Sequence, residues 1–408
     1  MNYRKFDLDK DKKAVYRILN EVGWVHDKKK DKYLNQMLPK ANTIVHEIAG
    51  EAEVLVNSSY GTIQYQNEKL KFAATTGVAG SLMVRKQGLA GRLTAIRMAL
   101  DALAGMEVAG LCIFDQGFYN KLGYGNGNYT NLIAFTPSKM DIKRRVKLPT
   151  RLTAKDLDKI HTNRENRMPY HGAVTLPKFT TEAELGEEKE TVGFGYFDEN
   201  GNLTHHLWFY GKGKEEGPIW IKWMAYENME QLMDLLALLQ SFGDQYHLIR
   251  MIEPPFIQMQ DFLKRPYLNR NITRKAALEN VITASNYWQI RILDLKACLS
   301  KTSLNCETLK FNLILTDPIS KYLPRDMKWQ GIAGDYIVTL GKESKAELGI
   351  DELLPIMKAS VGAFTRLWYG YQPASSLVYS DDLQAEAELL QKLDKAICLP
   401  KAQIDWGF

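Results

Sequence analysis

The stretch RKQGLAG (residues 85–91) has the residue types of a phosphate-binding loop. It joins an expected strand to an expected helix, where Gly88, Ala90 and Gly91 would let phosphates approach the backbone closely. Unpaired N–H groups at the start of a helix favour an anion. Full positive charges come from Arg85, Lys86 and Arg92. The spacing matches neither a P-loop nor a GxGxxG motif, and taken alone the glycine is equally consistent with an ordinary strand–helix turn.

About thirty residues further along, QGFYNKLGYG follows the apolar, strand-like stretch AGLCIF. A helical turn over residues 117–122 would place Phe118 and Leu122 on one packed face. Tyr119, rotated by about 100° from Phe118, could then face a cleft. Gly123 suits the left-handed residue that ends such a helix. A phenol with a pKa of about 10 keeps its proton at neutral pH and can give it to a thiolate.

The two stretches together resemble the paired signatures of the GCN5-related N-acetyltransferase (GNAT) superfamily. RKQGLA fits the R/Q-x-x-G-x-G/A pattern that cradles the pyrophosphate of acetyl-CoA, and FYNKLGYG follows in the order expected of the signature that flanks the thioester. The resemblance implies that Tyr119 donates a proton to the departing thiolate, with Tyr124 as the alternative; without it, a buried tyrosine that only packs would be preferred. The implied cofactor contacts are Leu82, Val84, Arg85, Lys86, Gln87, Gly88, Leu89, Ala90 and Gly91.

Other stretches extend the resemblance over essentially the whole chain. YWQIRILDLKACL (287–299), FTRLWYGYQPASSLV (364–378) and the final DWGF are similar to the Eis (enhanced intracellular survival) family within that superfamily. This similarity implies an α+β protein with an N-terminal GNAT domain (1–140), a degenerate GNAT-like domain (141–286) and a sterol-carrier-like domain (287–408). In that family the connection before the R-x-x-G motif is usually longer, whereas here SLMV runs straight into RKQG.

Hydrophobic periodicity independently indicates this order of elements. Successive strands are expected over 51–84, an amphipathic helix over 85–105 and a strand over 109–114. The turn residues Asn57-Ser-Ser and Gln66-Asn-Glu are expected to separate those strands. In the second region, a strand again leads into a helix, but their junction ENMEQ carries acids and no glycine run. A second copy of the fold would therefore have lost its phosphate-binding loop.

The C-terminal sequence AQIDWGF alternates Ile404, Trp406 and Phe408, which predicts a strand with one apolar face. A terminal aromatic side chain gains little from exposure, so its burial would hold the free α-carboxylate in place. The Eis resemblance implies that the carboxylate of Phe408 takes a proton from the substrate amine. Asp405 is a rival base, and burial or a water relay would have to raise the low basicity of either carboxylate.

Composition narrows the possible partners and locations. The net charge is only +5, and the basic residues are interspersed with acidic ones and not clustered, so a nucleic-acid partner is not expected. No apolar run is long enough for a membrane span or a signal peptide, and the four cysteines show no pairing motif, so a reducing cytoplasm is expected. No metal is expected, because His205 and His206 should point to opposite faces of a hairpin.

We therefore expect an acetyl-CoA-dependent N-acetyltransferase that acts on a primary amine. The acceptor would be an aminoglycoside, a polyamine or another small-molecule amine, or a peptide lysine, and it would attack directly because no activated Cys or Ser nucleophile is apparent. The resemblance also implies a homo-oligomer, a hexamer in the family. Candidate acceptor contacts are Trp24, His26 and Asp115. The alternative is a non-catalytic acyl-CoA sensor or lipid-binding module.

Overall fold

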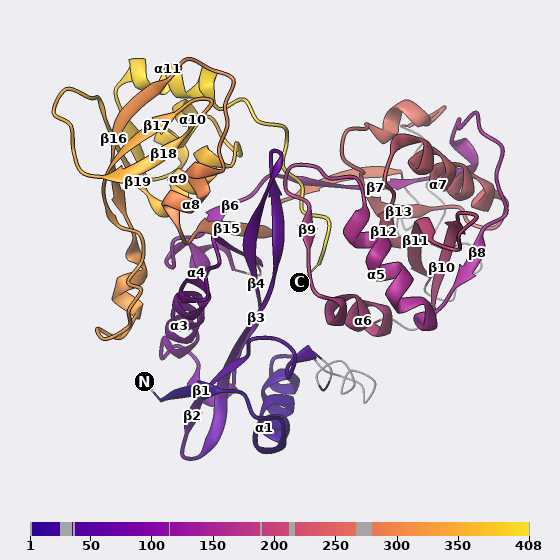
Figure 1. The fold of residues 1–408 in the computed structure, drawn as a ribbon. Helices are drawn as coiled ribbons and strands as arrows, with labels where there is room; N and C mark the ends of the chain where they lie inside the picture. Colours follow the sequence, from indigo (N-terminus) through magenta and orange to yellow (C-terminus); the bar gives the residue numbers. More distant parts are fainter. Residues whose placement is uncertain are drawn as a thin grey trace.

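A computed structural model describes residues 2–24, 35, 37–113, 115–187, 190–211, 217–266 and 280–407 of the 408-residue chain. Three β-sheets, each covered by helices, make up a mixed α/β structure (Figure 1). The first sheet and the second sheet lie on either side of the segment that leads to the C terminus, and the third sheet lies beyond one end of the first (Figure 1).

The first sheet has eight strands in the order β1-β2-β3-β4-β5-β15-β6, with β9 paired to β3. Its helices include the amphipathic α1 and the connection α3 between the parallel strands β4 and β5. The bounds are β1 Tyr3–Lys5, α1 Leu8–Glu21, β2 Ile44–Ile48, β3 Glu51–Tyr65, β4 Glu68–Gly80, α3 Leu89–Leu103, β5 Val108–Cys112, α4 Gln116–Asn120, β6 Gly125–Asn126, β9 Val174–Thr175 and β15 Trp288–Ile292.

The second sheet has seven strands in the order β14-β7-β13-β12-β11-β10-β8. Helices α5 and α7 pack against β11, and α6 packs against α5. The bounds are β7 Thr130–Phe135, β8 Thr150–Leu152, α5 Leu157–Asn166, α6 Lys178–Glu187, β10 Thr191–Phe197, β11 Leu203–Gly211, β12 Ile219–Ala225, α7 Met229–Ser241, β13 Ile249–Ile252 and β14 Val281–Ser285.

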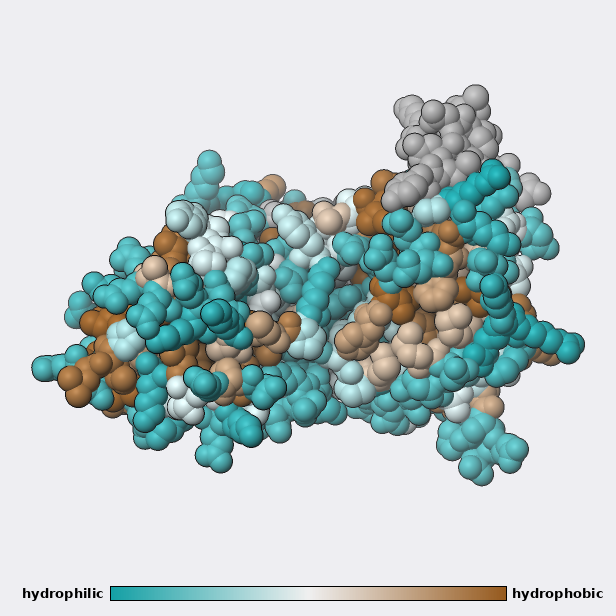
Figure 2. Space-filling view, turned by 90° about the horizontal axis from the view of Figure 1, so that it is seen from above, coloured by the Kyte–Doolittle hydropathy of each residue, from teal (hydrophilic) through white to brown (hydrophobic). Residues whose placement is uncertain are grey.

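The third sheet has five strands in the order β18-β17-β16-β19-β20. The bounds of its elements are α8 Leu295–Ser300, β16 Leu309–Thr316, β17 Gly334–Leu340, β18 Lys345–Leu348, β19 Ile356–Ser360, α9 Val361–Trp368, α10 Ala374–Ser380, β20 Leu383–Ala385 and α11 Ala387–Ala396. Seen from above, hydrophilic residues cover most of the molecule, with hydrophobic residues gathered over the third sheet and over the second (Figure 2). Within the described residues, no helix is both long and apolar enough to cross a membrane.

The predicted domain boundaries at residues 140 and 287 do not coincide with the sheets. Strand β7, from the predicted first domain, pairs with β13 and β14 of the second sheet. Strand β15, from the predicted third domain, pairs with β5 and β6 of the first sheet. The first sheet is therefore completed by a strand that comes more than a hundred residues later in the chain.

Strand β3 runs without interruption through the expected turn at Asn57-Ser58-Ser59. These polar side chains are buried, and Ser58 Oγ donates a hydrogen bond of 2.7 Å to Asp101 of α3. Asp101 also accepts from Arg97 Nε at 2.9 Å, and burial raises the pKa of its carboxyl group. The strand continues through the expected turn, and of these three polar residues Ser58 finds a buried partner on the neighbouring helix.

Strand β15 carries a buried arginine into the first sheet. The Arg291 side chain is completely buried, forms an ion pair with the equally buried Asp317, and donates a hydrogen bond to the carbonyl oxygen of Leu122. Asp317 accepts backbone N–H groups of Ile319 and Ile332 at 3.1 and 2.9 Å. This cluster joins β15 and the segment that follows β16 of the third sheet to the turn that follows α4.

Replacing Arg291 by methionine should lower the free energy of unfolding by about 3–5 kcal/mol, because Asp317 is left buried without its cation. Urea denaturation measures the change. The control is Glu388→Gln, which breaks an exposed 2.6 Å pair with Lys392 and should cost no more than about 0.5 kcal/mol. Equal stability of the two variants would contradict the structural role of the Arg291–Asp317 pair.

Candidate functional site

Strands β4 and β5 separate at the carboxyl end of their short parallel pairing. They are paired only from Phe72–Val108 to Thr75–Leu111. Between Leu55–Ala79 and Asn57–Thr76 the register of β3 and β4 shifts, because β4 has one extra residue at Gly77 and Val78. Gly77 has φ +61°, and a side chain there would meet Asn57 Nδ2 at 2.6 Å. The bulge lies where the two strands diverge, so backbone donors of β4 beyond Thr75 have no partner strand on the β5 side.

The segment before α3 has the geometry of an anion site. Gly88 is the N-cap of α3 with φ +74°, and it makes no side-chain cap, so the first N–H groups of the helix have no capping side chain. A Cβ added at Gly88 would meet nothing within 4 Å, which leaves this backbone open to a ligand. Arg85, Lys86, Gln87 and Arg92 are exposed beside it. Leu89 and Ala90 are half-buried, and Gly91 packs inward next to Phe118 of α4.

The expectation that Leu82 and Val84 belong to the cofactor strand is not met. Strand β4 ends at Gly80, and residues 82–84 form a 3₁₀ turn. The Leu82 side chain is 56% exposed, whereas Val84 is buried in the core that holds α3. The apolar stretch of residues 82–84 therefore does not extend strand β4. Val84 is apolar because it packs in the core beneath α3. Residues 76–80 of β4 are better placed than these two to line the cleft.

Tyr119 lies on the short helix α4, as the sequence predicts. Asp115 caps the helix by accepting the Phe118 N–H at 3.2 Å, and Gly123 ends the turn with φ +82°. The expected orientation, with Phe118 packed and Tyr119 facing a cleft, is not met: Tyr119 is 5% exposed and more buried than Phe118, because its ring packs edge-on against Phe118 and Tyr124. Burial raises the pKa of Tyr119 to about 12, with a smaller contribution from Asp115. The hydroxyl therefore keeps its proton throughout the neutral range.

Tyr124, the alternative donor, reaches the point where β4 and β5 separate. Its hydroxyl lies 3.5 Å from Thr75 Oγ1, and the side chain is buried. Burial raises the pKa of Tyr124 well above its ordinary value. Tyr124 therefore lies beside the last residue of β4 that is paired with β5, and Tyr119 packs edge-on against Tyr124.

The glycines around Tyr124 are explained by the segments that pack on them. A Cβ at Gly123 would lie 2.5 Å from Val361 Cγ1 and 2.6 Å from Arg291 Nη1. At Gly125 it would lie 2.5 Å from the carbonyl oxygen of Gly362, which belongs to α9. Elements of the third sheet therefore press directly on the turn that carries the candidate proton donors.

The other acceptor candidates are less closely tied to this cleft. Trp24 follows α1 and is 45% exposed, and Asp115 is exposed and acts as the cap of α4. His26 lies outside the described residues. The structure therefore brings the turn bearing Tyr119 and Tyr124 together with the start of α3, while Trp24 remains a candidate for the outer part of an acceptor site.

The histidine pair of the second sheet lies on opposite faces, as predicted. His206 is buried between Asn163 Oδ1 at 2.6 Å and Trp223 Nε1 at 2.9 Å, whereas the His205 ring faces Asp234 of α7. Burial lowers the pKa of His205 to about 4 and that of His206 to about 3. Among the described residues, no group of three His, Cys, Asp or Glu side chains is arranged to hold a metal ion.

The C-terminal segment is extended but forms no strand, contrary to expectation. Ala402, Ile404 and Trp406 are buried in alternation, so the predicted apolar face exists. Pairing is irregular because the Asp405 carboxylate, in place of a backbone carbonyl, accepts the Val174 N–H at 3.1 Å. Phe408 lies outside the described residues.

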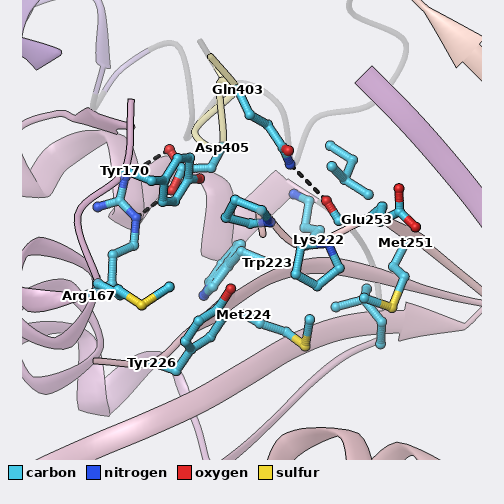
Figure 3. Close-up of a pocket in the computed structure, with 15 residues that line it drawn as sticks. Arg167, Tyr170, Lys222, Trp223, Met224, Tyr226, Met251, Glu253, Gln403 and Asp405 are labelled. Atoms are coloured by element: carbon cyan, nitrogen blue, oxygen red, sulfur yellow. Dashed lines mark hydrogen bonds and ion pairs between the residues drawn. The ribbon is translucent and has the colours of Figure 1, made fainter. Parts of the chain in front are cut away.

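Asp405 is a poor candidate for the base. Burial by itself would raise the pKa of this carboxyl group, but the Arg167 guanidinium and the Tyr170 hydroxyl outweigh burial and hold the pKa below its usual range. Arg167 binds both carboxylate oxygens, with Nη2 at 2.8 Å from Oδ1 (Figure 3). A carboxylate held so firmly in its charged form and with its oxygens occupied has little capacity to take a proton.

Sequence reasoning missed three contributors to the site. The bulge at Gly77 and Val78 is hidden in a long strand, although Thr-Thr-Gly within an apolar run is a usable signal for it. The sequence did not predict the roles of Arg291 and Arg167, because most arginines in proteins are exposed. Their partners, Asp317 and Asp405, are also not adjacent to them in the sequence.

Comparisons with known proteins agree with this geometry at the level of the fold. A protein of Enterococcus faecalis described as a probable N-acyltransferase shares 15% identity and a TM-score of 0.81, covering 100% of this chain and 99% of that one. A GCN5-related N-acetyltransferase of Anabaena variabilis shares 11% identity and a TM-score of 0.81, with complete coverage of both chains. Eis1 of Mycobacterium abscessus shares 12% identity and a TM-score of 0.76, also over both complete chains.

No protein-family model matches the sequence, and no curated protein matches it. At identities of 11–15%, these similarities establish the fold of the chain but not its activity. The chain therefore has the fold of the GCN5-related N-acetyltransferases along its whole length, in an arrangement shared with Eis1.

The exposed cations of the loop should contribute directly to CoA binding. Arg85→Gln and Arg92→Gln should each weaken CoA binding about tenfold at low salt, because a charged hydrogen bond contributes about 1.5 kcal/mol. The loss should shrink as salt screens the charges. Titration calorimetry measures the affinity, with the distant exposed Lys342→Gln as the control. If both variants bind CoA as tightly as the control, these side chains do not contact the phosphates.

Proposed function

We propose that this protein is an N-acetyltransferase that transfers acetyl from acetyl-CoA to a primary amine. The proposal is carried by one observation: an uncapped helix start with a glycine N-cap and a turn bearing two buried tyrosines meet where β4 and β5 diverge. The exposed backbone of residues 85–88 fits a pyrophosphate, since Gly88 leaves open space and cations flank it. The fold shared with N-acetyltransferases supports the same assignment.

In this mechanism the start of α3 holds the phosphates, and the diverging strands receive the pantetheine arm. Backbone N–H groups of β4 beyond Thr75 would stabilise the oxyanion of the tetrahedral intermediate. Tyr119, or Tyr124, donates a proton to the departing thiolate. The amine attacks the thioester directly. The carboxylate of Phe408 is the proposed acceptor of the ammonium proton.

Narrower parts of the family resemblance remain predictions. They include the choice among aminoglycoside, polyamine and lysine-like acceptors, hexamer assembly, a cytoplasmic location and a sterol-carrier-like third domain. An acyl-CoA sensor without catalysis is the second candidate function, favoured only by the burial of Tyr119, which also suits a packing role.

Tyr119→Phe should reduce kcat by about 10²–10⁴ without changing the KM for acetyl-CoA, because only the proton donor is lost. Since the pKa of Tyr119 is raised to about 12, its deprotonation should cause no fall in wild-type activity between about pH 7 and 10. Steady-state rates of thiol release measure both effects. Tyr124→Phe is the matched variant: if it shows the loss and Tyr119→Phe does not, the two roles are exchanged.

Extending the chain by two glycines beyond Phe408 should abolish amine-dependent release of CoA while leaving acetyl-CoA binding unchanged, because the terminal carboxylate is moved. The assay compares the wild type and the extended variant across a panel of amines. Unchanged release after extension would keep the acetyltransferase and assign proton transfer to water or to another group. No release by the wild type with any amine, despite acetyl-CoA binding, would favour the sensor.

A further inference from the structure

The second sheet repeats the strand arrangement that forms the candidate acyl site in the first. Strands β12 and β13 are parallel and joined through α7, as β4 and β5 are joined through α3. They pair only at Ile219–Ile249 and Trp220–Arg250, and then separate toward their carboxyl ends. The second sheet therefore contains a diverging strand pair equivalent to the one proposed to receive acetyl-CoA.

The end of this second cleft is a pocket of about 70 Å³ (Figure 3). Residues of β12 and the segment after β13 line it, together with Arg167, Tyr170 and two residues of the C-terminal segment. Helix α7 offers no anion site here, because Asn228 caps it by accepting the Gln231 N–H at 3.0 Å, and Glu230 lies in its first turn. The start of α7 therefore disfavours a phosphate, because the Asn228 side chain already accepts one of its free N–H groups and Glu230 adds a negative charge.

The chain's own C-terminal segment occupies the edge of this pocket. Gln403 Nε2 donates to the carbonyl oxygen of Glu253 at 2.8 Å, just beyond β13. The partly buried Asp405 carboxylate is bound by Arg167 and accepts the Val174 N–H of β9, while Arg167 Nη2 donates to the Val174 carbonyl. Since β9 pairs with β3, this cluster joins the C-terminal segment to the first and second sheets at once.

Trp406 provides a second anchor one residue further along. Its ring is buried, with the Arg164 guanidinium 3.6 Å from its centre and Trp223 on the other side of Arg164 at 4.3 Å. Arg164 is also ion-paired with Glu184 of α6, and Gly407 lies beside Glu184. In Figure 1 the C terminus accordingly emerges between α6 and the β3–β4 hairpin of the first sheet.

We propose that the second domain's cleft has become a dock for the chain's own C-terminal segment, and that Arg167 and Arg164 are positioning residues for the terminal carboxylate. This inference rests on the proposed function, in which that carboxylate takes the amine proton. The degenerate domain then contributes to catalysis without binding a nucleotide-bearing ligand. It holds Asp405 by a partly buried ion pair with Arg167 and Trp406 by the stacked guanidinium of Arg164.

The test compares Asp405→Asn, which removes the charge and keeps the shape, with Asp381→Asn, which breaks a 2.7 Å pair with Arg366 in the third domain. Gln403→Met is a milder second variant that loses only one hydrogen bond to the dock, in case Asp405→Asn does not fold. Circular dichroism and thermal melting establish folding. Two readouts follow: release of Phe408 by carboxypeptidase Y, and steady-state kinetics with acetyl-CoA and an accepted amine.

Asp405→Asn should release Phe408 at least tenfold faster than Asp381→Asn, and Gln403→Met should do so about fivefold faster. For both dock variants, kcat per folded enzyme should fall and the KM for acetyl-CoA should stay unchanged, at a temperature where circular dichroism and thermal melting show each variant to be as fully folded as Asp381→Asn. Equal release from all variants would overturn the dock. Faster release with unchanged kcat would keep the dock but overturn the positioning role. A wild type without any transferase activity would refute the proposed function, while the release rates would still decide whether the dock exists.

Discussion

The insertion of β15 into the first sheet is the constraint on which the candidate active site depends. This strand lies between β5 and β6, and it brings Arg291 into contact with Asp317 and with the carbonyl of Leu122. The turn after α4 is therefore held from the side of the third domain. Without the strand, β5 would become an edge and the turn bearing the tyrosines would lose its main polar anchor.

The first and second sheets contain the same local arrangement, a pair of briefly paired parallel strands joined through a helix. In the first, the helix after the diverging strand begins with an uncapped glycine and exposed cations. In the second, the equivalent helix begins with Asn228 as a cap and with acids, and a protein segment lies at the cleft. The two helix starts differ in only a few residues at the strand–helix junction. Free N–H groups and cations favour an anion at the start of α3, whereas a side-chain cap and acids disfavour one at the start of α7.

Burial explains why several sequence patterns were interpreted correctly and others were not. The α4 turn, its left-handed Gly123 and the alternation of Ile404 and Trp406 depend on local periodicity, and all three are present. The expected turn at residues 57–59 and the expected strand at the C terminus are absent. In both places a polar side chain binds a partner distant in sequence: Ser58 binds Asp101, and Asp405 binds Arg167. The local sequence pattern cannot predict such a partner.

By itself, the sequence determined the glycine-led helix α3, the short aromatic helix α4 that carries Tyr119, the mixture of helices and strands, and the acidic junction without a glycine run before α7. These features follow from residue spacing over one or two helical turns, where propensity and periodicity act directly. Only the tertiary structure decided where β4 ends, that β7 joins the second sheet and β15 the first, that Arg291 is fully buried and that Arg167 binds Asp405. Those outcomes depend on partners well separated in the sequence, from 26 residues for Arg291 and Asp317 to 238 for Arg167 and Asp405, and a buried charge is stable only when its partner is in place.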